Sequence, residues 1–95
     1  MALKFSGDAE TSQIIALKAL GYLAADEDLL EPFLGSTGLV VGDLRAGATD
    51  SAFLAGILDY FLQNEALLLA FAGASELAPE TIVRARQRLP GALND

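Results

Sequence analysis

The sequence predicts an all-α protein, folded as a compact orthogonal bundle of five to six short helices. Apolar residues recur every three to four positions over most of the chain, which is the spacing of one helix face. Helix-starting polar residues and helix-ending Gly or Pro separate these stretches. The apolar fraction of 53% in 95 residues is sufficient for one packed core. We therefore expect a single helical domain over residues 1–95, with frayed ends at residues 1–6 and 91–95.

The first helix is predicted from about Asp8 to Ala25, with Ser6 or Asp8 as its N-cap. One stripe of this helix should face the core, and it consists of Ala16, Ala19, Leu20 and Leu23, flanked by Ile15 and Tyr22. Ile14 and Leu17 fall outside the stripe. Their spacing fits two interpretations, a wider core contact or a surface for a second subunit.

The second helix is predicted to begin at residue 27 or 28 and to end before Gly38, which can adopt the left-handed conformation after a helix. Pro32 should then lie in or near the first turn, because a proline deeper in a helix removes a backbone hydrogen bond. A short helix over residues 42–46 should follow, anchored by Leu44.

The stretch from Asp50 to Phe71 is the most informative, because two apolar helical patterns are separated only by Gln63-Asn64-Glu65. Asp50 is expected to cap the first helix, and Asn64 the second. The apolar positions of the first are Phe53, Leu54, Ile57, Leu58, Phe61 and Leu62. The second, over about residues 66–74, has almost no polar face and should be enclosed by its neighbours. We expect these two helices to form a central antiparallel pair.

The last helix is predicted from Pro79, in the favoured first position, to about Leu89. Arg84 and Arg88 lie one turn apart on a face shared with Glu80. Two interpretations stay open: a solvated face with an ion pair between Glu80 and Arg84, or a docking patch for an acidic partner or a second subunit.

Several phrases along the chain, in order, resemble a small proteobacterial family known only as a domain of unknown function, family 3572. The matching phrases are ALKALGYLAAD, FLGSTGL, DLRAGATDSAFLAGILDYFLQNEALLLAFA and ARQRLPG. The resemblance covers nearly the whole chain from Ala16 onward. It implies a compact helical protein without an established activity.

The composition limits both chemistry and partners. The chain has no His and no Cys, which removes the usual base near neutral pH, the thiol nucleophile and the imidazole and thiolate metal ligands. We therefore expect no enzymatic activity and no cofactor. The net charge of −7 disfavours nucleic acid and anionic membrane surfaces as partners. Because no apolar run is long enough to cross a bilayer and the start lacks an export signal, a cytoplasmic location is expected.

Two local groups have both a structural and a functional interpretation. Asp26, Asp28 and Glu31 belong to the densest acidic cluster and either favour the start of the second helix or bind a hard cation such as Mg²⁺ or Ca²⁺. Ser51 follows Asp50 at a helix start, which resembles the attachment site of acyl carrier proteins, whose serine bears phosphopantetheine. The alternative is that Asp50 caps the helix and Ser51 is an ordinary first-turn residue.

Arg45 precedes the Phe53–Leu62 pattern by one short loop. We expect it to tie the short helix to Asp59 or Asp50 through an ion pair, in a structural role.

Together these features predict a noncatalytic protein-interaction module. The specific version is a homodimer formed through Ile14 and Leu17 of the first helix, with a protein partner as the other possibility. The alternatives are an acyl-carrier-like protein modified at Ser51 and a metal-binding protein that uses carboxylates.

Overall fold

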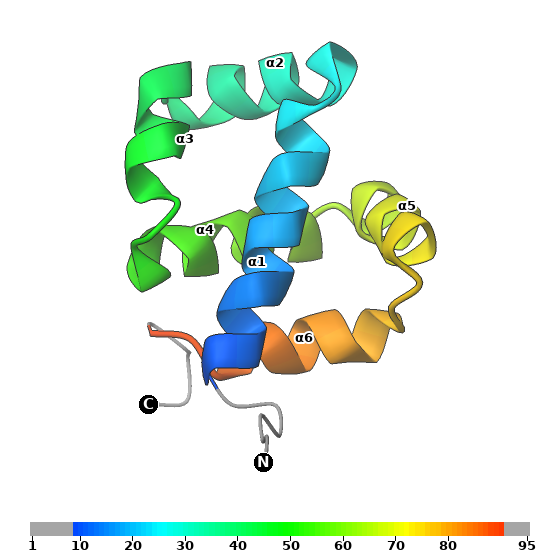
Figure 1. Ribbon diagram of the computed structural model, residues 1–95. Coiled ribbons are helices and arrows are strands. Elements are labelled where there is room, and N and C mark those ends of the chain that lie inside the picture. The colour runs from blue at the N-terminus through cyan, green and yellow to red at the C-terminus, as the bar shows by residue number, and fades with distance from the viewer. Residues whose placement is uncertain (1–8, 91–95) are drawn as a thin grey trace.

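The computed structural model describes residues 9–90, which fold into six helices around one core and contain no strand. The helices are α1 (Ala9–Ala24), α2 (Glu27–Thr37), α3 (Val41–Gly47), α4 (Ser51–Leu62), α5 (Glu65–Ser75) and α6 (Pro79–Gln87). Figure 1 shows α1 crossing the bundle, with α2, α4 and α6 lying across it at successive levels. The predicted all-α bundle is confirmed. The frayed ends predicted at residues 1–6 and 91–95, and the cap at Ser6 or Asp8, lie outside the described residues.

The central helix of the bundle is α1, which contacts α2, α4, α5 and α6. Its predicted core stripe is buried, and Ala16, Ala19 and Leu23 have no exposed surface. Small side chains at a helix contact allow the neighbouring axes to approach closely. The expectation of a central antiparallel pair formed by α4 and α5 is wrong, since the chain turns by 110° between them and α1 packs against both.

An aromatic cluster joins the helices inside the core. The ring centroids of Tyr22 on α1 and Phe71 on α5 are 5.5 Å apart, and those of Phe61 on α4 and Phe71 are 5.2 Å apart. Phe33 on α2 meets Tyr60 on α4 edge to face at 4.8 Å. Aromatic pairs at these separations stabilise a fold by about 0.5–1.5 kcal/mol beyond their burial. The cluster therefore links four of the six helices.

Local hydrogen bonds define both ends of α2. The Asp26 carboxylate accepts from the N–H of Asp28 at 2.9 Å, and Gly38 ends the helix with φ +78°. Pro32 lies one turn deeper than expected, inside the helix. The hydrogen bond that it removes would have ended on the carbonyl of Asp28, in the exposed first turn, where water can replace it.

The short helix α3 extends one residue beyond each predicted end, and Leu44 anchors it in the core as expected. Its start is held by the Asp43 carboxylate, which accepts from the N–H of Val40 at 2.9 Å. Its last residue, Gly47, lies so close to α4 that a Cβ there would overlap the ring of Phe53. The absence of a side chain at Gly47 thus allows α3 to pack directly on the first turns of α4.

The helix α5 is not enclosed by its neighbours, contrary to the prediction from its composition. Leu67, Phe71 and Ala72 face the core, whereas the Leu69 side chain is 50% exposed. Further exposed positions on α5 are Ala66, Ala70, Gly73 and Ala74. Because α5 lies at the edge of the bundle (Figure 1), only one side of the helix meets α1, α4 and α6.

Candidate functional site

An apolar groove of about 380 Å³ lies where α1, α2 and α3 meet. We call it the α1–α3 groove. Its floor is formed by Leu20 and Leu44, which are buried, and its sides by Leu17 from α1 and Val41 from α3. Leu17 is 42% exposed and Val41 is 53% exposed. Two large aliphatic side chains from different helices therefore border one concave surface and remain largely in contact with solvent.

Two further large aliphatic residues that are close in the chain to the groove's lining residues are exposed. Ile14, one turn before Leu17 on α1, is 48% exposed, and Val40, directly before α3, is 62% exposed. The alternative in which Ile14 and Leu17 widen the core is therefore wrong. Single exposed aliphatic residues are common, but a contiguous group is characteristic of an interaction surface.

Positive charge borders the same groove. Lys18 and Arg45 are the only cationic side chains within residues 9–83. Arg45 lines the groove, and Lys18 directly follows Leu17 on α1; both side chains are exposed. Within residues 9–90 neither forms an ion pair. The groove thus combines an apolar floor with one lining cation, Arg45, and Lys18 is the next residue after the lining Leu17.

The expected tie from Arg45 to Asp59 or Asp50 is wrong. Asp59 instead pairs with Arg86 of α6, with Nε to Oδ1 at 2.6 Å and Nη2 to Oδ2 at 3.2 Å. Arg86 also donates to the backbone carbonyls of Leu89 and Pro90. The carboxylate of Asp50 accepts from the N–H of Ala52 and caps α4 as predicted. Asp59 therefore connects α4 to α6, and Arg45 remains at the surface.

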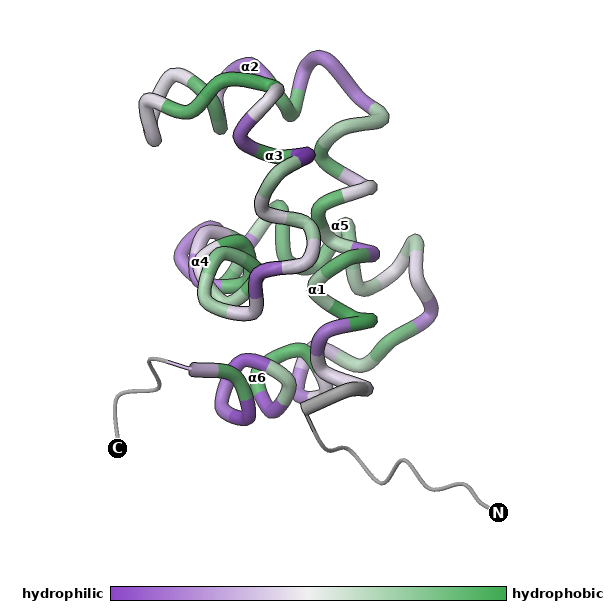
Figure 2. The backbone as a smooth tube through the Cα atoms, turned by 60° about the vertical axis from the view of Figure 1, so that its left-hand side comes forward, coloured by the Kyte–Doolittle hydropathy of each residue, from purple (hydrophilic) through white to green (hydrophobic). Residues whose placement is uncertain are grey.

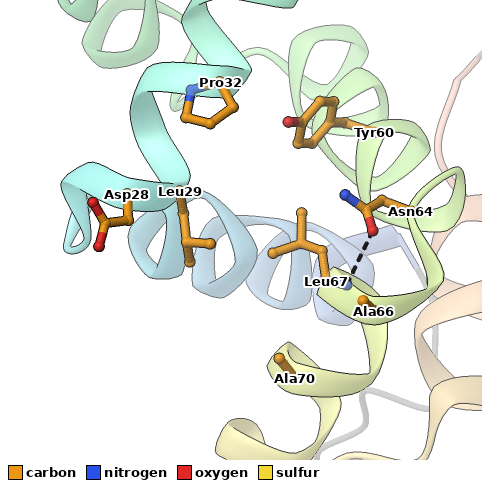
Figure 3. Close-up of a pocket in the computed structure, with 8 residues that line it drawn as sticks. All are labelled: Asp28, Leu29, Pro32, Tyr60, Asn64, Ala66, Leu67 and Ala70. Atoms are coloured by element: carbon orange, nitrogen blue, oxygen red, sulfur yellow. Dashed lines mark hydrogen bonds between the residues drawn. The ribbon is translucent and has the colours of Figure 1, made fainter.

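A second apolar groove, of about 280 Å³, separates α2 from the α4–α5 corner (Figure 3). Leu29 and Leu67 face each other across it, Ala66 and Ala70 come from the exposed side of α5, and Asp28 lies at its rim. The Asn64 side chain at the corner accepts from the N–H of Leu67 at 3.2 Å, which caps α5 as predicted. The groove therefore continues the uncovered face of α5 onto α2.

A third groove, of about 670 Å³, exposes more polar surface than the other two and lies between the end of α2 and the α4–α5 corner. The hydroxyls of Ser36 and Thr37 both donate to the carbonyl of Phe33, at 3.2 and 2.8 Å. Asp59, which also lines this groove, is held by Arg86. These polar groups are therefore used to end α2 and to join α4 to α6.

The candidate metal and carrier residues occupy helix starts. Asp26 is the N-cap of α2, and Asp28 and Glu31 are exposed on that helix. The acidic turn between α1 and α2 is the hydrophilic corner seen in Figure 2. No three acidic side chains of the described residues are grouped so that they could hold a metal ion. Ser51 is the first residue of α4, directly after the capping Asp50, and is partly exposed.

The basic side chains of α6 lie apart from the α1–α3 groove, at the opposite end of the bundle (Figure 1). Arg84 and Arg88 are exposed, and the Arg88 guanidinium donates to the carbonyl of Arg84 at 3.4 Å. The ion pair expected between Glu80 and Arg84 is not formed in the described part of the chain. The two arginines are thus solvated side chains near the end of α6.

Sequence reasoning missed the contributions of Val41, Arg45 and Leu69 to these surfaces. Val41 was not singled out because the helix that carries it was expected to begin one residue later. Leu69 had a usable signal, since at 100° per residue Glu65, Leu69 and Glu76 fall on one side of α5. On a helix that is otherwise apolar, the side that carries the glutamates is expected to face solvent.

None of the described helices is by itself long and apolar enough to cross a bilayer. α4 and α5 meet the length and composition criteria only as a pair, and the chain turns by 110° between them. The apolar residues of α4 are accounted for by the core, in which Leu54, Ile57, Leu58 and Phe61 are buried.

The fold and its grooves define a small helical domain with uncovered apolar surfaces. The model of the family described as "Protein of unknown function (DUF3572)" matches residues 9–92, and the chain therefore belongs to this family. No curated protein and no solved structure is significantly similar to the chain.

Proposed function

We propose that the protein is a noncatalytic interaction module that associates with a second copy of itself through the α1–α3 groove. The observation that carries this proposal is that Leu17 and Val41, both largely exposed, border one apolar groove. Removing apolar surface from water is favourable by about 25 cal/mol per Å², and association has to offset its entropic cost from this gain. Association through this groove would cover the exposed side chains of both helices together.

The noncatalytic part of the proposal is supported by composition and by the use of the polar groups. The chain contains neither His nor Cys. In the third groove, the hydroxyls of Ser36 and Thr37 bond to the end of α2, and the carboxylate of Asp59 is held in the ion pair with Arg86. We place the interaction in the cytoplasm, with which a chain lacking cysteine is compatible.

The groove predicts weak association. A standard interface buries about 800 Å² on each partner, which is about one seventh of this protein's accessible surface of 5532 Å². A groove bordered by a few side chains covers less than this area. We therefore expect a monomer–oligomer equilibrium at tens of micromolar rather than a permanent dimer.

Sedimentation velocity over a range of protein concentrations tests the proposal. The wild-type protein should sediment faster as its concentration rises, whereas Leu17→Glu should remain monomeric because a charge would be buried in the interface. Val83→Glu is the matched control, since Val83 is 37% exposed on α6, away from the groove, and this variant should behave as wild type. Thermal unfolding of each variant verifies that it folds. A wild-type protein that stays monomeric at tens of micromolar would contradict the proposal.

A further inference from the structure

The exposed side of α5 is a second uncovered apolar surface. It is formed by Leu69 together with the small residues Ala66, Ala70 and Gly73. Leu69 is 50% exposed, and a Cβ built on Gly73 would meet nothing within 4 Å apart from its chain neighbours and the adjacent backbone of its own helix. One large side chain therefore projects among small ones on this helix side, and on the side of Ala66 and Ala70 the surface slopes into the second apolar groove. We call this exposed helix side the α5 ridge.

The α5 ridge and the α1–α3 groove carry opposite charges. Glu65 is the first residue of α5 and Glu76 is its C-cap, so one carboxylate lies at each end of the ridge, and no cationic residue lies on this helix. The groove is lined by one cation, Arg45, and a second exposed cation, Lys18, follows the lining residue Leu17 in the chain. Complementary charges at the rim of an interface set its orientation and partner choice.

Their shapes are also complementary. The groove is concave, with Leu20 and Leu44 at its floor, and its volume of about 380 Å³ suits the side chains of one helix face. The ridge has one projecting leucine. Small residues on both surfaces, including Gly21 and Ala24 in the groove, allow two helix backbones to approach closely.

We propose that the α5 ridge of one copy docks in the α1–α3 groove of a second copy. Leu69 enters the groove between Leu17 and Val41, and the glutamates at the ends of α5 lie near Lys18 and Arg45. This inference rests on the proposed function, because the groove is the docking surface in both. The inference adds that α5 is the helix that docks in the groove.

The contact joins two different surfaces, so it is heterologous. Each copy offers one ridge and one groove, and the contact therefore closes into a ring or a reciprocal pair, or repeats along an open chain. An isologous dimer formed by two α1 helices differs from this arrangement in a measurable way, since it does not involve α5.

The decisive experiment mixes two variants, Leu17→Glu and Leu69→Glu. Each is expected to be monomeric alone in sedimentation velocity, because one lacks a functional groove and the other a functional ridge. Their equimolar mixture should form a heterodimer, since the intact ridge of Leu17→Glu can enter the intact groove of Leu69→Glu. Val83→Glu alone is the control for charge introduced outside both surfaces, and it should self-associate as wild type.

The outcomes separate this inference from the proposed function. If Leu69→Glu self-associates as wild type while Leu17→Glu does not, the groove mediates association but α5 is not its occupant. If the two variants are monomeric alone and their mixture also stays monomeric at concentrations well above those at which the wild type associates, which allow for its single contact, the heterologous contact is wrong. If both variants self-associate as wild type, both proposals fail.

Charge reversal supplies an independent test. Arg45→Glu should weaken self-association several-fold, because it places a carboxylate near the glutamates of the docked helix. Arg84→Glu changes the net charge equally on exposed α6 and should leave association unchanged. Equal weakening by both variants would show a general charge effect and would overturn the predicted placement of Arg45.

Discussion

α4 and α5 are consecutive helices made mostly of apolar residues, but their side chains are buried to different extents. On α4, Leu54, Ile57, Leu58 and Phe61 are each no more than 2% exposed. On α5, Leu67 and Phe71 are buried, but Leu69, two residues from each, is 50% exposed. Apolar composition therefore indicates that a helix has surface to bury, and its position in the bundle decides how much of that surface is covered within one chain.

The difference follows from the neighbours of each helix. The apolar side of α4 meets α1, α5 and α6, with α3 packed over its start, whereas α5 lies at the edge and is met from one side only. The acidic residues of the two helices also differ in whether they form an ion pair. Asp59 of α4 is paired with Arg86, whereas Glu65 and Glu76 of α5 form no ion pair within residues 9–90. These differences explain why we assign the docking role to α5.

The largest expected effect compares one core residue of α4 with one exposed residue of α5. Phe61→Ala should lower the free energy of unfolding by about 3–5 kcal/mol, because Phe61 has no exposed surface and the change leaves a cavity. Leu69→Ala should change it by about 0.5 kcal/mol or less at concentrations where the protein is monomeric. Urea denaturation measures both values. A loss above about 2 kcal/mol for Leu69→Ala would mean that Leu69 is packed in the core.

An intermediate effect is expected from the carboxylates of the two helices. Asp59→Asn should destabilise the fold by about 1–2 kcal/mol, because the Arg86 side chain is only 13% exposed and its two-point contact with Asp59 loses the carboxylate charge. Glu65→Gln should cost about 0.5 kcal/mol or less, since only a favourable helix-terminus charge is lost. Thermal unfolding at low and high salt measures the two changes. Equal losses of stability in the two variants would show that the Asp59 carboxylate contributes no more to the fold than the Glu65 carboxylate.

The smallest effect concerns the end of α5, where Glu76 adopts the left-handed conformation with φ 58°. The N–H of Leu77 donates to the carbonyl of Ala72 across this turn at 2.9 Å. Glu76→Gly should raise the free energy of unfolding by up to about 1 kcal/mol, because glycine adopts this conformation without steric cost. The same substitution should weaken self-association slightly by removing a carboxylate. Gly38→Ala is the control, since Gly38 also has a left-handed backbone, with φ +78°. This substitution should lower the free energy of unfolding by about 1 kcal/mol, the opposite of the effect expected for Glu76→Gly.

Much of the fold could be predicted from the sequence because local signals specify helix boundaries. Asp50 and Asn64 cap α4 and α5, Gly38 ends α2 and Pro79 begins α6, as their residue types indicate. The buried stripe of α1 also followed from its periodicity. Such features depend on residues within one or two turns of each other, which the sequence displays directly.

Features that depend on distant parts of the chain were not predictable in this way. Arg86 and Asp59 are 27 residues apart, and nothing near either residue identifies the other as its partner. A helix that is apolar on nearly all sides has no periodic stripe, so the sequence could not show which side of α5 meets the core. The candidate groove likewise depends on α3 lying beside α1, which brings Val41 and Arg45 to Leu17.

The central claim, that α5 has a face open in the monomer and covered on association, has a direct test in a chain without cysteine. A thiol-reactive reagent would be applied to Leu69→Cys over a range of protein concentrations, with Val83→Cys as the exposed control. The account predicts fast labelling of Leu69→Cys in dilute solution and slower labelling as concentration rises, with Val83→Cys unchanged throughout. Slow labelling of Leu69→Cys at every concentration, or a fast rate that never declines, would contradict it.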